Sequence, residues 1–331
     1  MLFSILIPVY NADRYLKQCL ESIVAQTYRD FEVWMINDGS KDNSGEICNE
    51  YARKYPHMHV VHRENRGTII TRAELVSYAQ GDYCLFVDSD DYIRKDALDI
   101  VKNVLLETNA DCVVFGLERI MNGCSIGVTT EDAAYELESK AEIYSKLLGD
   151  VRYNSLCTKC IRTCKLKGFD AVPYRHFRMG EDLIQGLYAY KKMGKVAFIP
   201  DVLYYYIMNP DSTSHTTNKE NFRACCDIYN TVMDILGDEV DPNSMVAETI
   251  RSNYAWYLTL DILCVERFEL PKSEKLNILK EIALGSKDIL DGAVSKVRIG
   301  KRYPLYVLLK YGFFRCCLML AWLVNKKNRA H

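Results

Sequence analysis

The stretch from Gly81 to Ile93 constrains the fold more than any other part of the sequence. Within it, residues 83–87 form a short apolar run between a Gly-Asp pair and a group of acids, which predicts a buried strand. Three carboxylates follow within four positions: Asp88, Asp90 and Asp91. Ligands of open α/β sheets bind at the carboxyl ends of strands, where crowded carboxylates favour a hard cation such as Mg²⁺ or Mn²⁺. The alternative is a solvated acidic turn that leads into the cap of a helix over 96–107.

Apolar strands that end in polar loops recur along the first half of the chain. Strands are expected over 2–9, 31–36, 58–62, 83–87 and 111–117. The segments between them carry apolar residues at helical spacing, so the order predicts an α/β fold with a doubly wound, mostly parallel sheet flanked by helices. No GxGxxG follows the first strand and Asn37-Asp38-Gly39-Ser40 is no Walker A loop, which disfavours a dehydrogenase and a P-loop kinase.

The next part of the chain contains an acidic pair at a predicted helix start. Residues 122–150 are polar, with one helix expected over 139–148, and a last strand is expected over 196–206. Between them, Glu181 and Asp182 open an apolar-periodic helix. Acids in a first helical turn are favoured by the helix dipole, so the pair has a structural interpretation as well as a functional one.

Charge is distributed unevenly along the 331 residues. The formal net charge is −2, yet no acid follows Asp291 while nine Lys and Arg residues do, which leaves 33 basic against 44 acidic residues up to that point. This acidic body argues against a nucleic-acid partner. The 13 cysteines are scattered, and the opening Met-Leu-Phe-Ser lacks a basic segment. We therefore expect no signal peptide and a cytoplasmic protein with free thiols.

The C-terminal part predicts a helical extension. Helices are expected over 219–236, 244–266 and 273–290. Residues 303–324 are highly apolar, but Lys310 and Arg315 interrupt them and leave at most ten uncharged residues in a row, too few to span a membrane. Two interpretations of 296–331 are open: a basic amphipathic helix on an anionic inner leaflet, or a helix that packs on the protein or on a second subunit in a homodimer.

Several pieces of the sequence, in order, resemble the family 2 glycosyltransferases, which have the GT-A fold. The pieces are Ile7-Pro8-Val9-Tyr10-Asn11, Asn37-Asp38-Gly39-Ser40-x-Asp42, Asn65-x-Gly67, Arg72, Gly81-Asp82-Tyr83 into Asp88-Ser89-Asp90-Asp91, Gly180-Glu181-Asp182, and Tyr204-Tyr205-Tyr206 followed by Ser212-x-Ser214-His215. The resemblance covers residues 2–218. It implies a GT-A domain with a nucleotide-binding half (1–118) and an acceptor half (119–218), followed by the helical extension (219–331).

The resemblance also assigns a donor site and a metal. The donor is a nucleotide sugar, expected to be UDP-linked, and its expected binding residues are Pro8, Val9, Tyr10, Asn11, Asp38, Gly39, Arg72, Asp88, Ser89 and Glu181. Among these, Asp38 would accept a hydrogen bond from a ring N–H of the base, and Asp88 would face the ribose. Asp90 and His215 are the expected ligands of Mn²⁺ or Mg²⁺.

The chemistry is assigned by the same resemblance to Asp182, which matches the catalytic base. It would deprotonate a hydroxyl of a glycan or lipid-linked acceptor as that hydroxyl attacks the anomeric carbon, while the metal stabilises the leaving diphosphate. One displacement inverts the anomeric configuration. Lys159 is expected near the acceptor, and Asp91 is left with the role of a helix cap.

Two other functions are weighed against this interpretation. A nucleotidyltransferase on a similar sheet would need a basic phosphate-binding loop after the first strand, where the sequence has Pro8-Val9-Tyr10-Asn11. A non-catalytic scaffold that only binds nucleotide sugars would not need Asp88, Asp90 and Asp182 together. The presence of all three acids favours an enzyme.

Overall fold

The computed structural model describes residues 1–177, 180–208 and 224–329. The chain divides into two compact units, the first formed by 1–143 and 152–213 and the second by 144–151 and 214–331. The boundary predicted after residue 218 lies outside the described residues.

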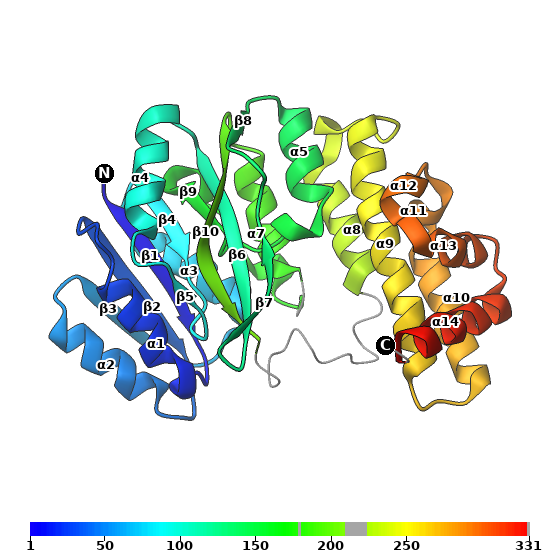
Figure 1. Ribbon diagram of the computed structural model, residues 1–331, viewed down its shortest axis with the longest axis horizontal. Helices are drawn as coiled ribbons and strands as arrows, with labels where there is room; N and C mark the ends of the chain where they lie inside the picture. Colours follow the sequence, from blue (N-terminus) through cyan, green and yellow to red (C-terminus); the bar gives the residue numbers. More distant parts are fainter. Residues whose placement is uncertain (178–179, 209–223, 330–331) are drawn as a thin grey trace. The chain divides into compact units, whose positions relative to one another are not determined.

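The first unit is built on one mixed sheet whose main strands are parallel (Figure 1). Its strands run in the order β3-β2-β1-β4-β9-β6-β10-β5, with β7 beside β6 and β8 beside β10. Their bounds are β1 Phe3–Val9, β2 Phe31–Asp38, β3 Met58–Arg63, β4 Tyr83–Phe86, β5 Tyr92–Ile93, β6 Cys112–Met121, β7 Cys124–Thr129, β8 Tyr135–Leu137, β9 Lys159–Arg162 and β10 Val196–Ile207. The predicted fold class is confirmed: an α/β domain with a mostly parallel central sheet.

Helices flank this sheet and explain the apolar runs in the sequence. They are α1 Asp13–Val24, α2 Ser44–Lys54, α3 Thr68–Tyr78, α4 Ala97–Thr108, α6 Thr163–Leu166 and α7 Glu181–Tyr190. Another helix, α5 Lys140–Leu148, begins in the first unit and continues into the second. In β1, Phe3, Ile5 and Ile7 point to one face and Leu6 to the other, and all four are fully buried. A strand that is covered on both faces has apolar residues at nearly every position, and the segment 2–9 has this pattern.

One strand in the middle of the sheet runs against its neighbours. β9 pairs antiparallel with both β4 and β6, whereas β1 pairs parallel with β2 and β4, and β6 pairs parallel with β10. The second half of the domain therefore supplies a central strand rather than an addition to the edge.

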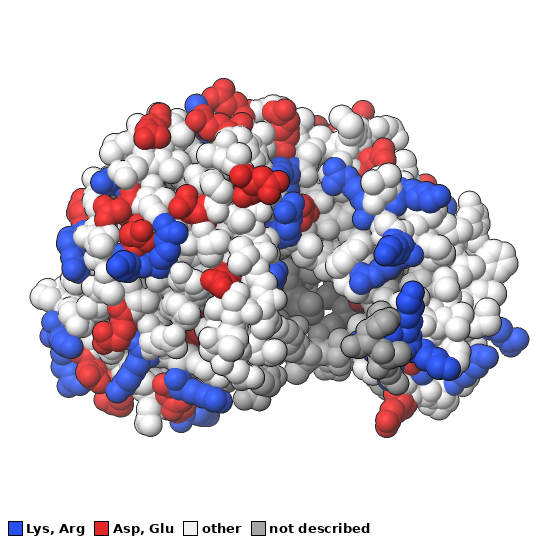
Figure 2. All heavy atoms as spheres, in the orientation of Figure 1, with Lys and Arg blue, Asp and Glu red and all other residues white. Residues whose placement is uncertain are grey.

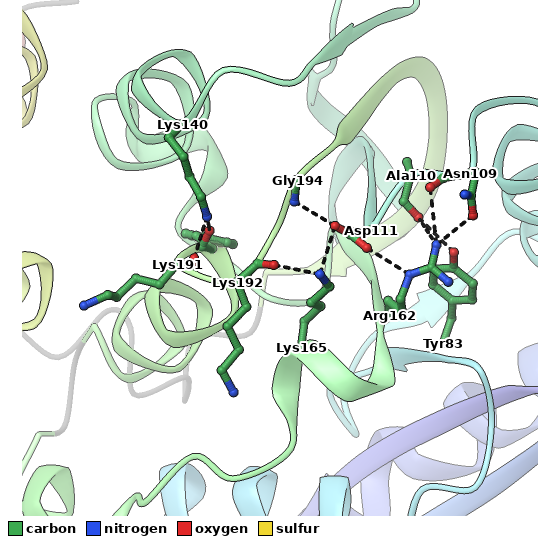
Figure 3. Close-up of polar contacts among 11 residues, drawn as sticks. Tyr83, Asn109, Ala110, Asp111, Lys140, Arg162, Lys165, Lys191, Lys192 and Gly194 are labelled. Carbon is green, nitrogen blue, oxygen red and sulfur yellow. Dashed lines mark hydrogen bonds and ion pairs between the residues drawn. The ribbon is translucent and has the colours of Figure 1, made fainter. Parts of the chain in front are cut away.

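A polar cluster around Asp111 ties together the end of the sheet where β4, β6 and β10 begin (Figure 3). Asp111 accepts from Arg162 Nε at 2.9 Å and from Gly194 N at 2.7 Å, and pairs with Lys165 Nζ at 3.2 Å. Burial raises the pKa of Asp111, but these hydrogen bonds and cations together bring it below its ordinary value. The cluster lies at the end of the sheet where the parallel strands begin, opposite their carboxyl ends.

The second unit consists of helices packed around α9. They are α8 Ala224–Leu236, α9 Met245–Arg267, α10 Lys272–Gly285, α11 Lys287–Asp291, α12 Lys296–Ile299, α13 Tyr303–Lys310 and α14 Phe314–Arg329. The segment predicted as one helix over 273–290 is divided at Ser286, and the apolar segment 303–324 is divided at 311–313, where Gly312 has φ +73°. In the part of the chain that the structure describes, no helix has the length and apolarity needed to span a bilayer.

Candidate functional site

The carboxyl ends of β1, β2 and β4 bring three polar loops to one edge of the sheet. These strands are parallel neighbours, so the segments after Val9, Asp38 and Phe86 meet there. The first two loops are hydrogen-bonded to each other: Asn11 N donates to Ser40 Oγ at 3.0 Å, and Lys41 N donates to Asn11 Oδ1 at 2.8 Å.

The predicted base-binding residues take different positions at this edge. Pro8 and Val9 lie within β1 beside Ile36 and Asn37 of β2, while Tyr10 is half exposed in the loop after them. Gly39 has φ +76°, and a Cβ there would come within 2.8 Å of Asn65 N. The backbone therefore needs glycine at this position.

Asp38 holds the loop after β3 in place. Its carboxylate accepts from Arg66 N and Gly67 N, each at 2.9 Å, and pairs with Arg63 at 3.1 Å. Both oxygens are thus engaged by the protein, and the side chain is buried. A ring N–H of a base, the predicted donor to Asp38, would have to share these oxygens with the backbone amides.

The prediction that Asp91 caps a helix is wrong. Asp91 is buried and accepts from Tyr204 Oη at 2.6 Å and from Ile207 N at 2.7 Å, both in β10. The residue before α4 is Asp96. The Tyr204 hydroxyl in turn accepts from Asp88 N at 3.2 Å. Asp91 therefore links the acidic turn to the last strand of the sheet.

The acidic turn holds three carboxylates close together, and the pKa values of two of them are raised. Burial and the neighbouring Asp88 raise the pKa of Asp90 to about 6. Burial, Asp90 and Asp88 raise the pKa of Asp91 well above its ordinary value. Ser89 lies in the same turn and is buried. Carboxylates with pKa values raised in this way are stabilised by a cation, so the turn fits the predicted metal chemically.

The residues that the structure describes do not by themselves complete a metal site. Within 1–177, 180–208 and 224–329, no three His, Cys, Asp or Glu side chains are arranged to hold a metal ion. His215, the second predicted ligand, lies outside the described residues.

Arg72 joins the acidic turn to α7. It is buried on α3, its Nη2 donates to Asp88 Oδ1 at 2.8 Å, and its Nη1 donates to Asp182 Oδ1. Burial alone would lower the pKa of Arg72, but Asp88 and the other nearby acids raise it above its ordinary value. A single guanidinium therefore brings two of the predicted site residues, from distant parts of the sequence, into one constellation.

Asp182 is held from a second side by the backbone. Gly180, with φ +77°, precedes α7, and Asp182 stands in the first turn of that helix. Its Oδ2 accepts from Leu156 N at 3.2 Å. Glu181 lies beside it, partly exposed, and burial of its carboxyl raises the pKa of Glu181 against the opposing effect of Arg72. The carboxylate of Asp182 remains about one-fifth exposed.

Lys159 does not have the position expected of an acceptor-binding residue. Its side chain is fully buried, and its Nζ donates to Tyr153 O at 2.6 Å and to Ser155 O at 2.5 Å. Burial lowers the pKa of Lys159 to about 8. The amine is engaged with the loop that presents Leu156 N to Asp182, so Lys159 supports the site from within.

The sequence is similar to those of known glycosyltransferases. A family model described as "Glycosyl transferase family 2" matches residues 4–166. "Glycosyltransferase GlyG" of Streptococcus pneumoniae serotype 4 is 30% identical over 221 residues, which cover 65% of this chain and 73% of that protein. The poly(ribitol-phosphate) beta-glucosyltransferase of Bacillus spizizenii is 31% identical over 241 residues, which cover 70% of this chain but only 37% of that longer protein.

A solved structure extends the similarity to almost the whole chain. S. aureus TarS, residues 1–349, in complex with UDP-GlcNAc, matches with a TM-score of 0.73 at 20% sequence identity. The match covers 99% of this chain and 92% of that one. At this identity the likeness shows a shared fold, and it includes the helices that follow the sheet.

Proposed function

This chain belongs to glycosyltransferase family 2, has the GT-A fold, and we propose that it transfers a sugar from a UDP-sugar to a hydroxyl of a glycan or lipid-linked acceptor with inversion. The observation that carries the proposal is the constellation of Asp88, Arg72 and Asp182. The Arg72 guanidinium contacts both Asp88, which is predicted to face the donor, and Asp182, the predicted catalytic base. The binding of UDP-GlcNAc by TarS supports a UDP-linked donor.

In the proposed reaction Asp182 takes the proton of the acceptor hydroxyl. The hydroxyl oxygen forms a bond to the anomeric carbon as the bond from that carbon to the diphosphate oxygen breaks, and UDP leaves with the electron pair. Attack from the face opposite the leaving group inverts the configuration. Leu156 N orients one oxygen of Asp182, and Arg72 donates to the other.

The donor would bind at the carboxyl edge of the sheet. The residues proposed to contact it follow β1, β2 and β4, and Arg72 would retain its bond to Asp88 while the ribose lies nearby. Asp90 and His215 are proposed to hold Mn²⁺ or Mg²⁺, which when bound supplies positive charge to the leaving diphosphate. The crowding of Asp88, Asp90 and Asp91 supports a cation in this place.

The experiment that tests this function measures UDP release by the purified full chain from a panel of nucleotide sugars. The panel includes UDP-GlcNAc and UDP-glucose, each with Mn²⁺, with Mg²⁺ and with chelator. We expect release from at least one UDP-sugar, and a loss of at least about a hundredfold in Asp182→Asn with UDP binding retained. Asp132→Asn, an exposed carboxylate of the same unit, is the matched control and should keep full activity.

Two results would favour the alternatives. Tight binding of UDP-sugars without release from any donor would indicate a scaffold. Release of pyrophosphate from a nucleoside triphosphate would indicate a nucleotidyltransferase. Activity that is the same with metal and with chelator would remove the metal from the proposal and leave the assignment of Asp182 untouched.

The proposed place of action is the cytoplasm, at the inner face of the membrane where a lipid-linked acceptor would be held. The support is the basic, apolar C-terminal sequence after Asp291.

A further inference from the structure

The last long helix, α14, has one face fixed against the protein. Its buried residues recur at helical spacing: Cys317, Leu318, Ala321 and Asn325. Asn325 is the anchor: its Nδ2 donates to Leu263 O at 3.0 Å, and its Oδ1 accepts from Arg267 Nε at 3.0 Å. Buried polar contacts of this kind are costly to break, so the rotation of α14 about its own axis is set.

The opposite face of α14 carries apolar side chains in the middle and cations at both ends. Met319, Trp322 and Leu323 are each about half exposed or more. Arg315 precedes them by one turn, and Lys326 and Lys327 follow by one turn; all three are exposed. We call these six residues the outer face of α14. Lys326 Nζ lies 5.1 Å from the centre of the Trp322 ring, so cation and aromatic ring are adjacent on it.

The turn before α14 adds further exposed apolar rings. Tyr311 and Phe313 flank Gly312 and expose 66% and 57% of their surface. Figure 2 shows Lys and Arg side chains gathered over the part of the C-terminal unit where Figure 1 draws α14. Exposed large apolar side chains that gather in this way, rimmed by charge, mark an interaction site rather than ordinary surface.

We infer that the outer face of α14, with Tyr311 and Phe313, docks on an anionic lipid surface. The charge of the segment selects this partner, because the sequence after Asp291 contains nine cations and no acid. A second copy of the same face would bring cations against cations, which is unfavourable. An anionic bilayer offers the complementary charge together with an apolar layer for Trp322 and its neighbours.

For α14, packing on the protein and contact with a membrane do not exclude each other. α14 packs on α9 as the protein-packing interpretation requires, and its outer face is exposed among the described residues. Neither α13 nor α14 crosses the bilayer in this arrangement. The helix lies along the surface, with its apolar centre at the depth of the headgroups and its cations near lipid phosphates.

The test is flotation of the full chain with vesicles of phosphatidylglycerol and phosphatidylethanolamine, compared with phosphatidylcholine alone. We expect flotation only with the anionic vesicles, weakened by added salt. Lys326→Gln/Lys327→Gln should lower the partition coefficient about 30-fold, since each cation near an anionic surface contributes roughly a fivefold factor. Lys272→Gln/Lys280→Gln, two exposed cations of α10, is the matched control and should change it less than about threefold.

The apolar contribution is tested separately. Trp322→Ala should lower partition about tenfold, whereas Met245→Ala, an exposed apolar residue of α9 outside this face, should leave it unchanged. Equal flotation with anionic and neutral vesicles, or equal losses in the two lysine pairs, would overturn the inference. So would a concentration-dependent dimer that dissociates in Trp322→Ala without any flotation, because a second copy would then be the partner.

This inference deepens the proposed function, since it concerns how a lipid-linked acceptor would be reached, but it can fail independently. The variants lie outside the catalytic constellation, and UDP release measured without vesicles should be unchanged in all of them. A chain that floats but releases no UDP contradicts the proposed function alone. A chain that releases UDP but does not float contradicts only the membrane surface.

Discussion

Arg72 donates to Asp182 across 110 residues of sequence, and the same guanidinium donates to Asp88. The residue proposed to bind the acceptor proton is therefore tied to the loop proposed to bind the donor. Because Arg72 is buried and its two bonds come from different nitrogens, its planar shape decides the distance between the two carboxylates.

Replacement of Arg72 by lysine keeps the positive charge but removes the planar guanidinium, so it should distinguish the contribution of the charge to activity from that of the shape. A single ammonium cannot span both carboxylates, so we expect Arg72→Lys to lower kcat/KM for UDP release about a hundredfold with most of the fold retained. Steady-state kinetics with the active donor measure this. Arg66→Lys is the control, since the Arg66 side chain is 64% exposed, and it should cost less than about twofold. Full activity of Arg72→Lys would show that charge alone suffices.

Removal of the Lys159 amine should disturb Asp182 through the intervening loop. Lys159→Met fills similar space but removes the hydrogen bonds from Nζ to Tyr153 O and Ser155 O, so the loop that presents Leu156 N should loosen. We expect kcat to fall about tenfold with little change in the KM for the donor. Lys167→Met, at an exposed position, serves as the control. A rise in KM at constant kcat would instead place Lys159 in substrate binding.

The contact between Tyr204 and Asp91 should contribute to the stability of the first unit. Tyr204→Phe removes the hydroxyl that donates to buried Asp91 and accepts from Asp88 N, and we expect the free energy of unfolding to fall by about 1–3 kcal/mol. Denaturant unfolding of the full chain measures this. Tyr205→Phe, whose ring stacks on Tyr92, should cost less than half as much. Equal losses in the free energy of unfolding would mean that the Tyr204 hydroxyl contributes no more to stability than that of Tyr205.

The second unit should lose stability as the pH rises, because of Asp261 on α9. Burial raises the pKa of Asp261 to about 8, and its Oδ2 has no hydrogen-bond partner among the described residues. The folded state therefore holds a proton that the unfolded state releases near pH 4, so stability falls between about pH 4 and pH 8.

The substitution Asp261→Asn removes this titration. At pH 8 it should raise the free energy of unfolding by roughly 2–4 kcal/mol, and near pH 4 it should have little effect. Unfolding followed at several pH values measures the difference. Asp238→Asn, at an exposed position in the same unit, should leave the pH dependence as it is. A pH dependence that persists in Asp261→Asn would assign it to another group.

Local sequence patterns were enough for most of the first unit. The continuous apolar run of β1 and the acids after β4 are strong signals, because burial on both faces and ligand sites at strand ends leave direct marks in the sequence. The helix that begins with Glu181 is marked in the same way by its apolar spacing. These elements lie where the patterns predicted them.

Contacts between distant segments could not be predicted in this way. Asp91 has the same chemistry as a helix cap, and only the passage of β10 beside it shows that it is buried. Lys159 resembles a surface lysine until β9 takes its central position. The role of Leu156 lies in its backbone N–H, which no side-chain pattern can reveal. In each case the deciding partner is set by the order of strands in the sheet.

The antiparallel strand β9 also determines when this protein can fold. Until residues 159–162 have been synthesised, β4 and β6 have no neighbour between them and both present open edges. A nascent chain of which only the first 118 residues have been synthesised therefore cannot join β4 to β6 through β9. Its unpaired strand edges remain exposed to wrong strand pairing. Fragments that end before β9 should consequently be poor starting points for a minimal nucleotide-binding domain, however complete their loop residues are.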